Sequence, residues 1–83
     1  MFYTYVLRSK KDGKLYIGYT KNLDSRISEH NSGKVQSTKY RIPFDLVYYE
    51  ACRNQKDALR REKYLKTTYG HRYLKNRTKN DLG

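Results

Sequence analysis

Two short tyrosine-bearing segments, separated by a turn, constrain the fold of this chain more than any other feature. Residues 2–8 and 15–19 alternate aromatic and β-branched residues with others, as β-strands do. Asp12-Gly13 lies between them and is a strong signal for the tight turn of a hairpin. The N-terminal part of the chain is therefore predicted to be an antiparallel β-hairpin.

The length of the hairpin loop decides how close the tyrosines come. Because side chains alternate along a strand, a loop of even length places Tyr5, Tyr16 and Gly18 on one face of the sheet. A two-residue loop pairs Ser9 with Tyr16 and leaves Tyr5 about 13 Å away along the sheet. A four-residue loop pairs Leu7 with Tyr16 and reduces the offset to about 7 Å. If the two tyrosines act together, the longer loop is favoured.

A first helix is predicted over residues 23–31, with Thr20 or Asn22 as its N-cap and the polar sequence Asn31-Ser32-Gly33 as its stop. Leu23 and Ile27 form its apolar stripe. At about 100° per residue, Arg26 and His30 lie on or beside that stripe. Both polar side chains are therefore expected to point toward the sheet.

A third strand is predicted over residues 44–51, after a basic loop at 33–41. Strict alternation would put Phe44, Leu46 and Tyr48 on one face. Such a sheet needs cover, which the helices must supply. The predicted class is α+β, a small three-stranded antiparallel sheet flanked by helices, in one domain over residues 1–83.

A second helix is predicted over residues 55–66, capped by Asn54. Its apolar stripe is Ala58, Leu59 and Leu65, and Glu62 falls inside that stripe. A carboxylate there has to be paired, hydrated or bound to a cation. Residues 67–70 are predicted to break the helix, residues 71–77 to add a last turn or two, and residues 78–83 to fray.

The charge of the chain indicates its partner. A net charge of +11 over 83 residues concentrates polyanions at the surface, so nucleic acid is the expected partner. No apolar run approaches the roughly 20 residues that span a bilayer, so a cytoplasmic location without membrane contact is expected. Cys52 is the single cysteine, which excludes an internal disulfide.

The spacing of the polar residues is specific. Tyr5 and Tyr16-Ile17-Gly18 are followed by Arg26, His30 and Glu62. This pattern resembles the GIY-YIG nuclease family over essentially the whole chain, in its small stand-alone bacterial form, which is similar to UPF0213 proteins and to the nuclease domain of excinuclease. The first half of the motif departs from the family pattern, because the chain reads Tyr3-Thr4-Tyr5 instead of Gly-Ile-Tyr. Asn76 is a further counterpart in the resemblance.

The resemblance implies a divalent-metal-dependent endonuclease that acts on DNA, which is either selective for structures met in repair or recombination, weakly specific, or recruited by a partner. Hydrolysis of a phosphodiester needs an activated water, charge relief on the phosphate and help for the leaving oxygen. Glu62 would hold one Mg²⁺ or Mn²⁺ ion, and Arg26 would grip the phosphate. Tyr5 or Tyr16 would orient or deprotonate the water, with Tyr5 favoured by the resemblance, and His30 would hold a phosphate oxygen or relay a proton.

Each of these residues taken alone is more typical of a structural role, and only their joint spacing favours a catalytic site. Two alternatives remain open: a binding module without activity on the same scaffold, and a small basic protein that associates with RNA. For the nuclease, a partner protein is one possible source of specificity, and the oligomeric state stays open. The cations expected to contact the phosphate backbone are Lys10, Lys11, Lys34, Lys39 and Arg41.

Overall fold

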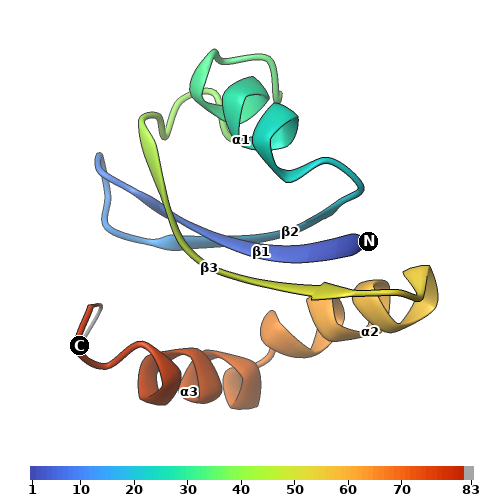
Figure 1. Ribbon diagram of the computed structural model, residues 1–83. Helices are drawn as coiled ribbons and strands as arrows, with labels where there is room; N and C mark the ends of the chain where they lie inside the picture. The colour runs from blue at the N-terminus through green and yellow to red at the C-terminus, as the bar shows by residue number, and fades with distance from the viewer. Residues whose placement is uncertain (82–83) are drawn as a thin grey trace.

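Three antiparallel strands form an open sheet with the order β2-β1-β3 in the computed structural model, which describes residues 1–81 (Figure 1). The strands are β1 (Phe2–Ser9), β2 (Leu15–Thr20) and β3 (Phe44–Cys52). The helices are α1 (Leu23–Asn31), α2 (Gln55–Leu65) and α3 (Thr68–Arg77). The predicted α+β class, a three-stranded antiparallel sheet flanked by helices, is confirmed.

The hairpin has the longer of the two predicted loops. Leu7 pairs with Tyr16 and Tyr5 pairs with Gly18, which is the register of the four-residue loop. The amide of Ser9 donates to the carbonyl of Lys14 at 3.0 Å and closes the loop. Gly13 ends the turn with a φ of 72°, a conformation that glycine adopts at little cost. The two tyrosines therefore share one face of the sheet.

Two asparagines begin the first two helices. The side chain of Asn22 accepts from the amide of Ser25, so Asn22 and not Thr20 is the N-cap of α1, whose predicted bounds are confirmed. Asn54 accepts from two amides at the start of α2, as predicted. Lys66 is the C-cap of α2, so this helix ends one residue earlier than predicted. Both caps satisfy amides that lack a partner within the helix.

The sheet separates two groups of helices. Helix α1 covers one face, and α2 and α3 lie against the other (Figure 1). On the α1 face Tyr5, Leu7 and Phe44 are buried together, with Leu23 and Ile27 packed against them. On the other face the buried group is Val6, Ile17, Leu65 and Leu74. Alternate residues of β1 thus fill two different cores.

The prediction that Phe44, Leu46 and Tyr48 share one face is wrong, because β3 contains a bulge. Val6 pairs with Tyr48 but Leu7 pairs with Leu46, so Val47 is an extra residue with no partner on β1. One inserted residue reverses the alternation. Tyr48 consequently packs on the core with Val6, whereas Phe44 packs with Tyr5 on the other side.

The predicted break at Thr67-Thr68-Tyr69-Gly70 is shorter than expected. Thr67 is the N-cap of α3 and accepts from the amide of Gly70, so Gly70 lies inside the helix. A Cβ atom at Gly70 would overlap the carbonyl oxygen of Tyr64 and the Cα of Leu65. The glycine is therefore required for the close approach of α3 to the end of α2, and it does not break the helix.

Part of the predicted frayed tail is hydrogen-bonded. Thr78 donates through its hydroxyl to the carbonyl of Leu74, and its own carbonyl accepts from the amide of Asp81. Residues 82 and 83, also assigned to that tail, lie outside the described residues. Among residues 1–81, no helix combines the length and the apolar character needed to cross a membrane.

Candidate active site

The phenol of Tyr5 is the centre of the candidate site. Tyr5 is 1% exposed, and its hydroxyl lies 2.8 Å from Nε2 of His30. Its ring lies directly over Gly18 of β2, where a Cβ atom would overlap the ring and the hydroxyl. The Tyr16 ring is 6.4 Å from the Tyr5 ring, between centroids. The second half of the tyrosine motif therefore supplies both a neighbouring phenol and the space for the first.

His30 points toward the sheet, as predicted, and is fully buried. Its Nε2 contacts the Tyr5 hydroxyl and its Nδ1 lies 2.8 Å from the hydroxyl of Thr38. The Thr38 oxygen also lies 3.5 Å from the carbonyl of Val35, which can only accept a hydrogen bond. This favours the tautomer with the proton on Nδ1, so that Nε2 accepts the proton of Tyr5. His30 and the Tyr5 hydroxyl are thus buried together, which favours a proton relay through Tyr5 over a direct phosphate contact of His30.

Thr38 is a site residue that the sequence did not reveal. The segment around it was predicted to be a basic loop, yet Thr38 is fully buried and orients the histidine ring. A single threonine in a polar loop has no periodic pattern that marks it as buried. Its contact with His30 depends on how residues 32–43 fold back over α1.

Arg26 lies beside the Tyr5 hydroxyl. Burial raises the pKa of Tyr5, and the nearby guanidinium of Arg26 opposes that rise. The pKa of Arg26 is raised in turn, chiefly by its interaction with Tyr5. Arg26 also forms an ion pair with Glu29 at 3.2 Å, and its side chain is 35% exposed. It is therefore a partly solvated cation next to a neutral, buried phenol.

Glu62 lies on α2, which packs against the face of the sheet opposite to α1. Its side chain is 19% exposed and pairs with Lys66 at 3.2 Å, one of the partners considered for a structural role. Its negative charge contributes to the raised pKa of Tyr5, as does Tyr16. Glu62 and Arg26 therefore come from opposite faces of the sheet, and both affect the pKa of Tyr5.

The residues present offer a metal ion a single carboxylate. Among residues 1–81 no group of three or more His, Cys, Asp or Glu side chains could hold a metal. One half-buried carboxylate suits a hard cation such as Mg²⁺ that keeps most of its waters, and it does not suit a closed protein cage. Glu62 thus fits the expected one-ion site in donor type.

The other predicted site residues have different surroundings. Asn76 follows buried Leu74 by two positions, so its side chain points about 200° away from the buried face of α3, and it is exposed.

The cations expected to contact phosphate differ in their partners. Lys10 pairs with Asp45 at 3.6 Å. Arg41 pairs with Asp12 at 3.0 Å and donates to the carbonyl of Lys14, so it connects the loop before β3 to the hairpin turn. Its guanidinium also lies over the ring of Phe44. Lys39 lies over the ring of Tyr40, and Lys11 and Lys34 are exposed.

The protonation of His30 is expected to make stability fall below neutral pH. Burial and the charge of Arg26 lower its pKa, and Glu29 opposes this. The unfolded chain, with a histidine pKa of about 6.5, then binds more protons than the folded chain, so the free energy of unfolding decreases as the pH falls through that range. Urea unfolding between pH 7.5 and 5 measures it.

His71 provides the matched control for this prediction. It is exposed at the start of α3, so a His71→Gln variant should keep the pH dependence of the wild type. A His30→Gln variant should lose most of it. An equal slope in the His30→Gln protein would assign the effect to other groups.

The fold and the site define a small α+β domain in which a tyrosine hairpin lies beside an arginine and a histidine of α1, with a glutamate on α2. Residues 1–78 match the GIY-YIG catalytic domain, and the chain belongs to the GIY-YIG family.

Similar proteins carry the name UPF0213. A UPF0213 protein of Staphylococcus haemolyticus is 43% identical over 74 residues, which cover 88% of this chain and 89% of that protein. One of Pediococcus acidilactici is 45% identical, with 90% and 82% covered. The solution NMR structure of a UPF0213 protein from Bacillus halodurans superimposes with a TM-score of 0.55 at 38% identity, covering 89% of this chain and 82% of that one. The predicted resemblance is confirmed.

Proposed function

We propose that this protein is a divalent-metal-dependent endonuclease that hydrolyses phosphodiester bonds in DNA. The observation that carries the proposal is the position of the Tyr5 hydroxyl, which lies 2.8 Å from Nε2 of His30. Arg26, Tyr16 and Glu62 all affect the pKa of this hydroxyl. Membership of the GIY-YIG family supports a nuclease of this type. The substrates we propose are branched or nicked DNA of the kind handled in repair or recombination.

The Tyr5-His30 pair would receive the proton of the attacking water. Because the pKa of Tyr5 is raised, its phenol is neutral at physiological pH and cannot act as a phenolate base. It can instead pass its own proton to Nε2 of His30 while its oxygen accepts one from the water. His30 is suited to this role because its lowered pKa keeps the ring neutral before the reaction. Thr38 would hold the ring in the required tautomer.

Arg26 and Tyr16 would bind the scissile phosphate. Both are more exposed than Tyr5, and the planar guanidinium of Arg26 matches two phosphate oxygens. Arg26 would exchange its exposed pair with Glu29, worth about 1 kcal/mol or less, for the phosphate. Glu62 would hold the metal ion, which when bound supplies Lewis-acid assistance to the leaving oxygen.

Incubation with branched, nicked and linear DNA tests this proposal. We expect cleavage in the presence of Mg²⁺ or Mn²⁺, with branched or nicked DNA cut faster than linear duplex, and none in EDTA. Gel analysis of end-labelled strands measures the rate and the cut position. Equal rates with and without the metal would contradict the metal-dependent proposal.

A second candidate function is a binding module without activity. The ion pairs of Arg26 with Glu29 and of Glu62 with Lys66 favour it, because both charged groups already have protein partners. The net charge of +11 would give salt-dependent binding to DNA or RNA without cleavage. DNA affinity that is unchanged by Glu62→Gln and by EDTA, without any cleavage, would support this function.

A further inference from the structure

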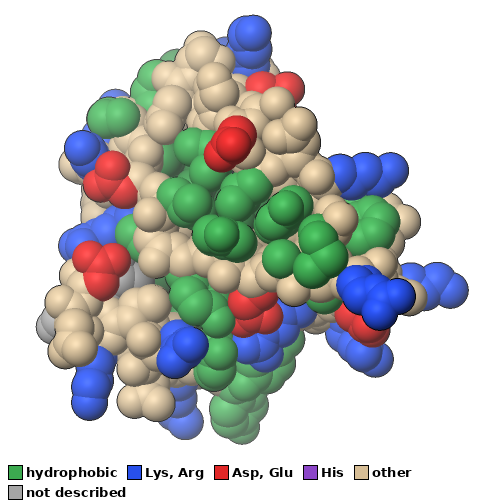
Figure 2. All heavy atoms as spheres, viewed as in Figure 1, with side chains coloured by type: hydrophobic (Ala, Val, Ile, Leu, Met, Phe, Trp, Pro, Cys, Tyr) green, Lys and Arg blue, Asp and Glu red, His purple; other side chains and the backbone are tan. Residues whose placement is uncertain are grey.

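The α1-facing side of the sheet is only partly covered. Tyr49 of β3 pairs with Tyr5 and therefore lies beside it on the same face, but Tyr49 is 50% exposed. Leu46 on the same strand is 38% exposed. Figure 2 shows the resulting band of hydrophobic side chains, which runs between α1 and β3 across the front of the molecule. An exposed apolar strip thus adjoins the candidate site.

Two tyrosines form the open part of this strip. The rings of Tyr3 and Tyr49 are 6.0 Å apart between centroids and inclined at 58°. The partner of Tyr3 on β3 is Ala51, a small exposed residue, and Tyr3 itself is half-buried. We call Tyr3 and Tyr49 the aromatic platform. Tyr3 precedes Tyr5 by two residues, so the platform begins about 7 Å from the centre of the candidate site.

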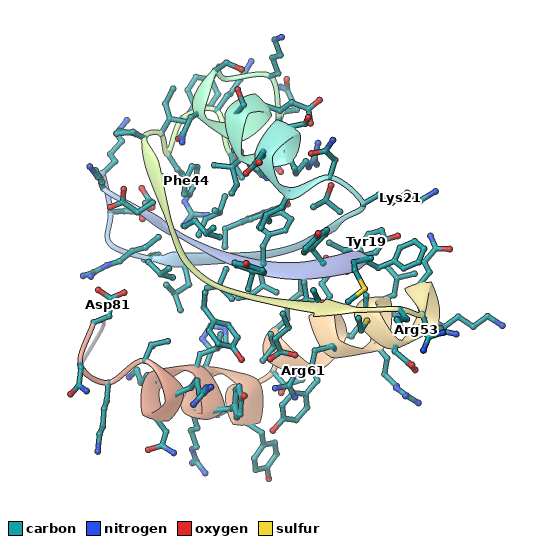
Figure 3. All side chains as sticks on the ribbon, viewed as in Figure 1. Tyr19, Lys21, Phe44, Arg53, Arg61 and Asp81 are labelled. Atoms are coloured by element: carbon teal, nitrogen blue, oxygen red, sulfur yellow. The ribbon has the colours of Figure 1, made fainter. Side chains whose placement is uncertain are left out.

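Cations stand at the open end of the platform. Lys21 directly follows β2 and Arg53 directly follows β3, and both lie at the right-hand end of the sheet in Figure 3. Both are exposed, and among residues 1–81 neither takes part in an ion pair. In Figure 2 several basic side chains project at this end of the hydrophobic band. The platform therefore combines ring faces with available positive charge.

We propose that the aromatic platform stacks an unpaired nucleobase of a DNA strand whose phosphates contact Lys21 and Arg53. This inference rests on the proposed function for the presence of DNA at the neighbouring Tyr5. A purely apolar partner would leave both cations without counterions, and a continuous duplex presents phosphates but no base faces. An unpaired strand offers both surfaces at once, as in proteins that bind single strands through aromatic and basic residues.

The platform places the unpaired base next to the bond that would be cut. Because Tyr49 pairs with Tyr5 across the sheet, a base stacked on Tyr49 lies within about one or two nucleotides of a phosphate bound at Arg26 and Tyr16. The substrate class is then DNA with unpaired bases at the cleavage position, such as a flap, a gap or a fork.

Fluorescence anisotropy in EDTA, where no cleavage occurs, tests the platform. The probes are a labelled single-stranded oligonucleotide, its duplex, and a strand of equal length with abasic sites in the centre. We expect the wild type to bind the intact strand most tightly. Tyr49→Ala should weaken that binding by about 5- to 150-fold, the range for the loss of one stacked base, and remove the preference over the abasic strand. Tyr49→Trp should retain both.

Tyr69 supplies the matched control, since it is 69% exposed on α3 on the other side of the sheet. Tyr69→Ala should bind like the wild type, and thermal unfolding should show that the variants are folded. Equal affinity of the wild type for the intact and the abasic strand would overturn the inference. So would a dimer in sedimentation that Tyr49→Ala dissociates, because a second copy would then cover the platform.

Binding and cleavage fail separately in these experiments. If the protein cleaves no DNA but prefers the intact strand, and Tyr49→Ala removes that preference, the endonuclease proposal is overturned and the aromatic platform is supported. If the protein cleaves DNA and Tyr49→Ala binds the intact strand as tightly as the wild type does, only the platform proposal is overturned.

Discussion

A Glu62→Gln variant is expected to lose DNA cleavage by about 100- to 1,000-fold while it keeps the fold and most of the DNA affinity. This is the scale observed when one group that stabilises developing charge is removed. Glu62 is the carboxylate whose charge acts on Tyr5, and glutamine keeps its shape but is a poor ligand for a hard cation. The lost ion pair with Lys66 costs about 1 kcal/mol or less, because Lys66 is mostly solvated.

The control for this variant is Asp57→Asn on the same helix. Asp57 is exposed and pairs with Arg60 at 3.0 Å, so this change removes a charge and an ion pair without touching the candidate site. Cleavage rates under single-turnover conditions and DNA affinities in EDTA should be those of the wild type. An Asp57→Asn defect as large as that of Glu62→Gln would mean that net charge, and not the position of Glu62, controls the rate.

A Gly18→Ala variant is expected to be destabilised by roughly 1–3 kcal/mol and to lose cleavage as well. The added methyl group would overlap the ring and hydroxyl of Tyr5, and the buried ring has no free space to enter. The strain would move the hydroxyl away from His30. Urea unfolding measures the stability, and an NMR spectrum of the His30 ring nitrogens reports the lost contact.

Gly33→Ala serves as the comparison for that variant. Gly33 has a φ of 78° and open space around its Cα, so alanine there strains the backbone without meeting another side chain. A stability loss is expected for Gly33→Ala with normal cleavage by the folded protein. Normal cleavage by folded Gly18→Ala would show that Tyr5 does not need its place over Gly18.

Local rules predict much of this fold from the sequence. The longer hairpin loop was favoured on the condition that Tyr5 and Tyr16 act together. Asn54 and, as one of two candidates, Asn22 could be predicted as N-caps because the first amides of a helix need an acceptor. The bulge at Val47 could not be predicted, since an inserted residue in an apolar strand changes no composition signal. Gly70 was predicted to break a helix, but glycine also allows two elements to pack closely, and only the tertiary structure shows that it does so here.

Some residues of the candidate site could also be predicted from the sequence, and others could not. Arg26 and His30 could be placed from helical periodicity, and Glu62 from its position inside an apolar stripe. The contact of His30 with Thr38 joins two segments through an irregular loop, which no periodicity describes. Arg41 was expected to bind phosphate, but its partners Asp12 and Phe44 depend on how the loop returns to the hairpin.

The most direct test of the central claim is a Mg²⁺ titration of DNA cleavage with the wild type and Glu62→Gln side by side. The proposed site predicts a rate that rises with Mg²⁺ for the wild type and stays at the level without metal for the variant, while both proteins bind the DNA. Equal rates for the two proteins at every Mg²⁺ concentration would contradict a catalytic site built around Tyr5, Arg26 and Glu62.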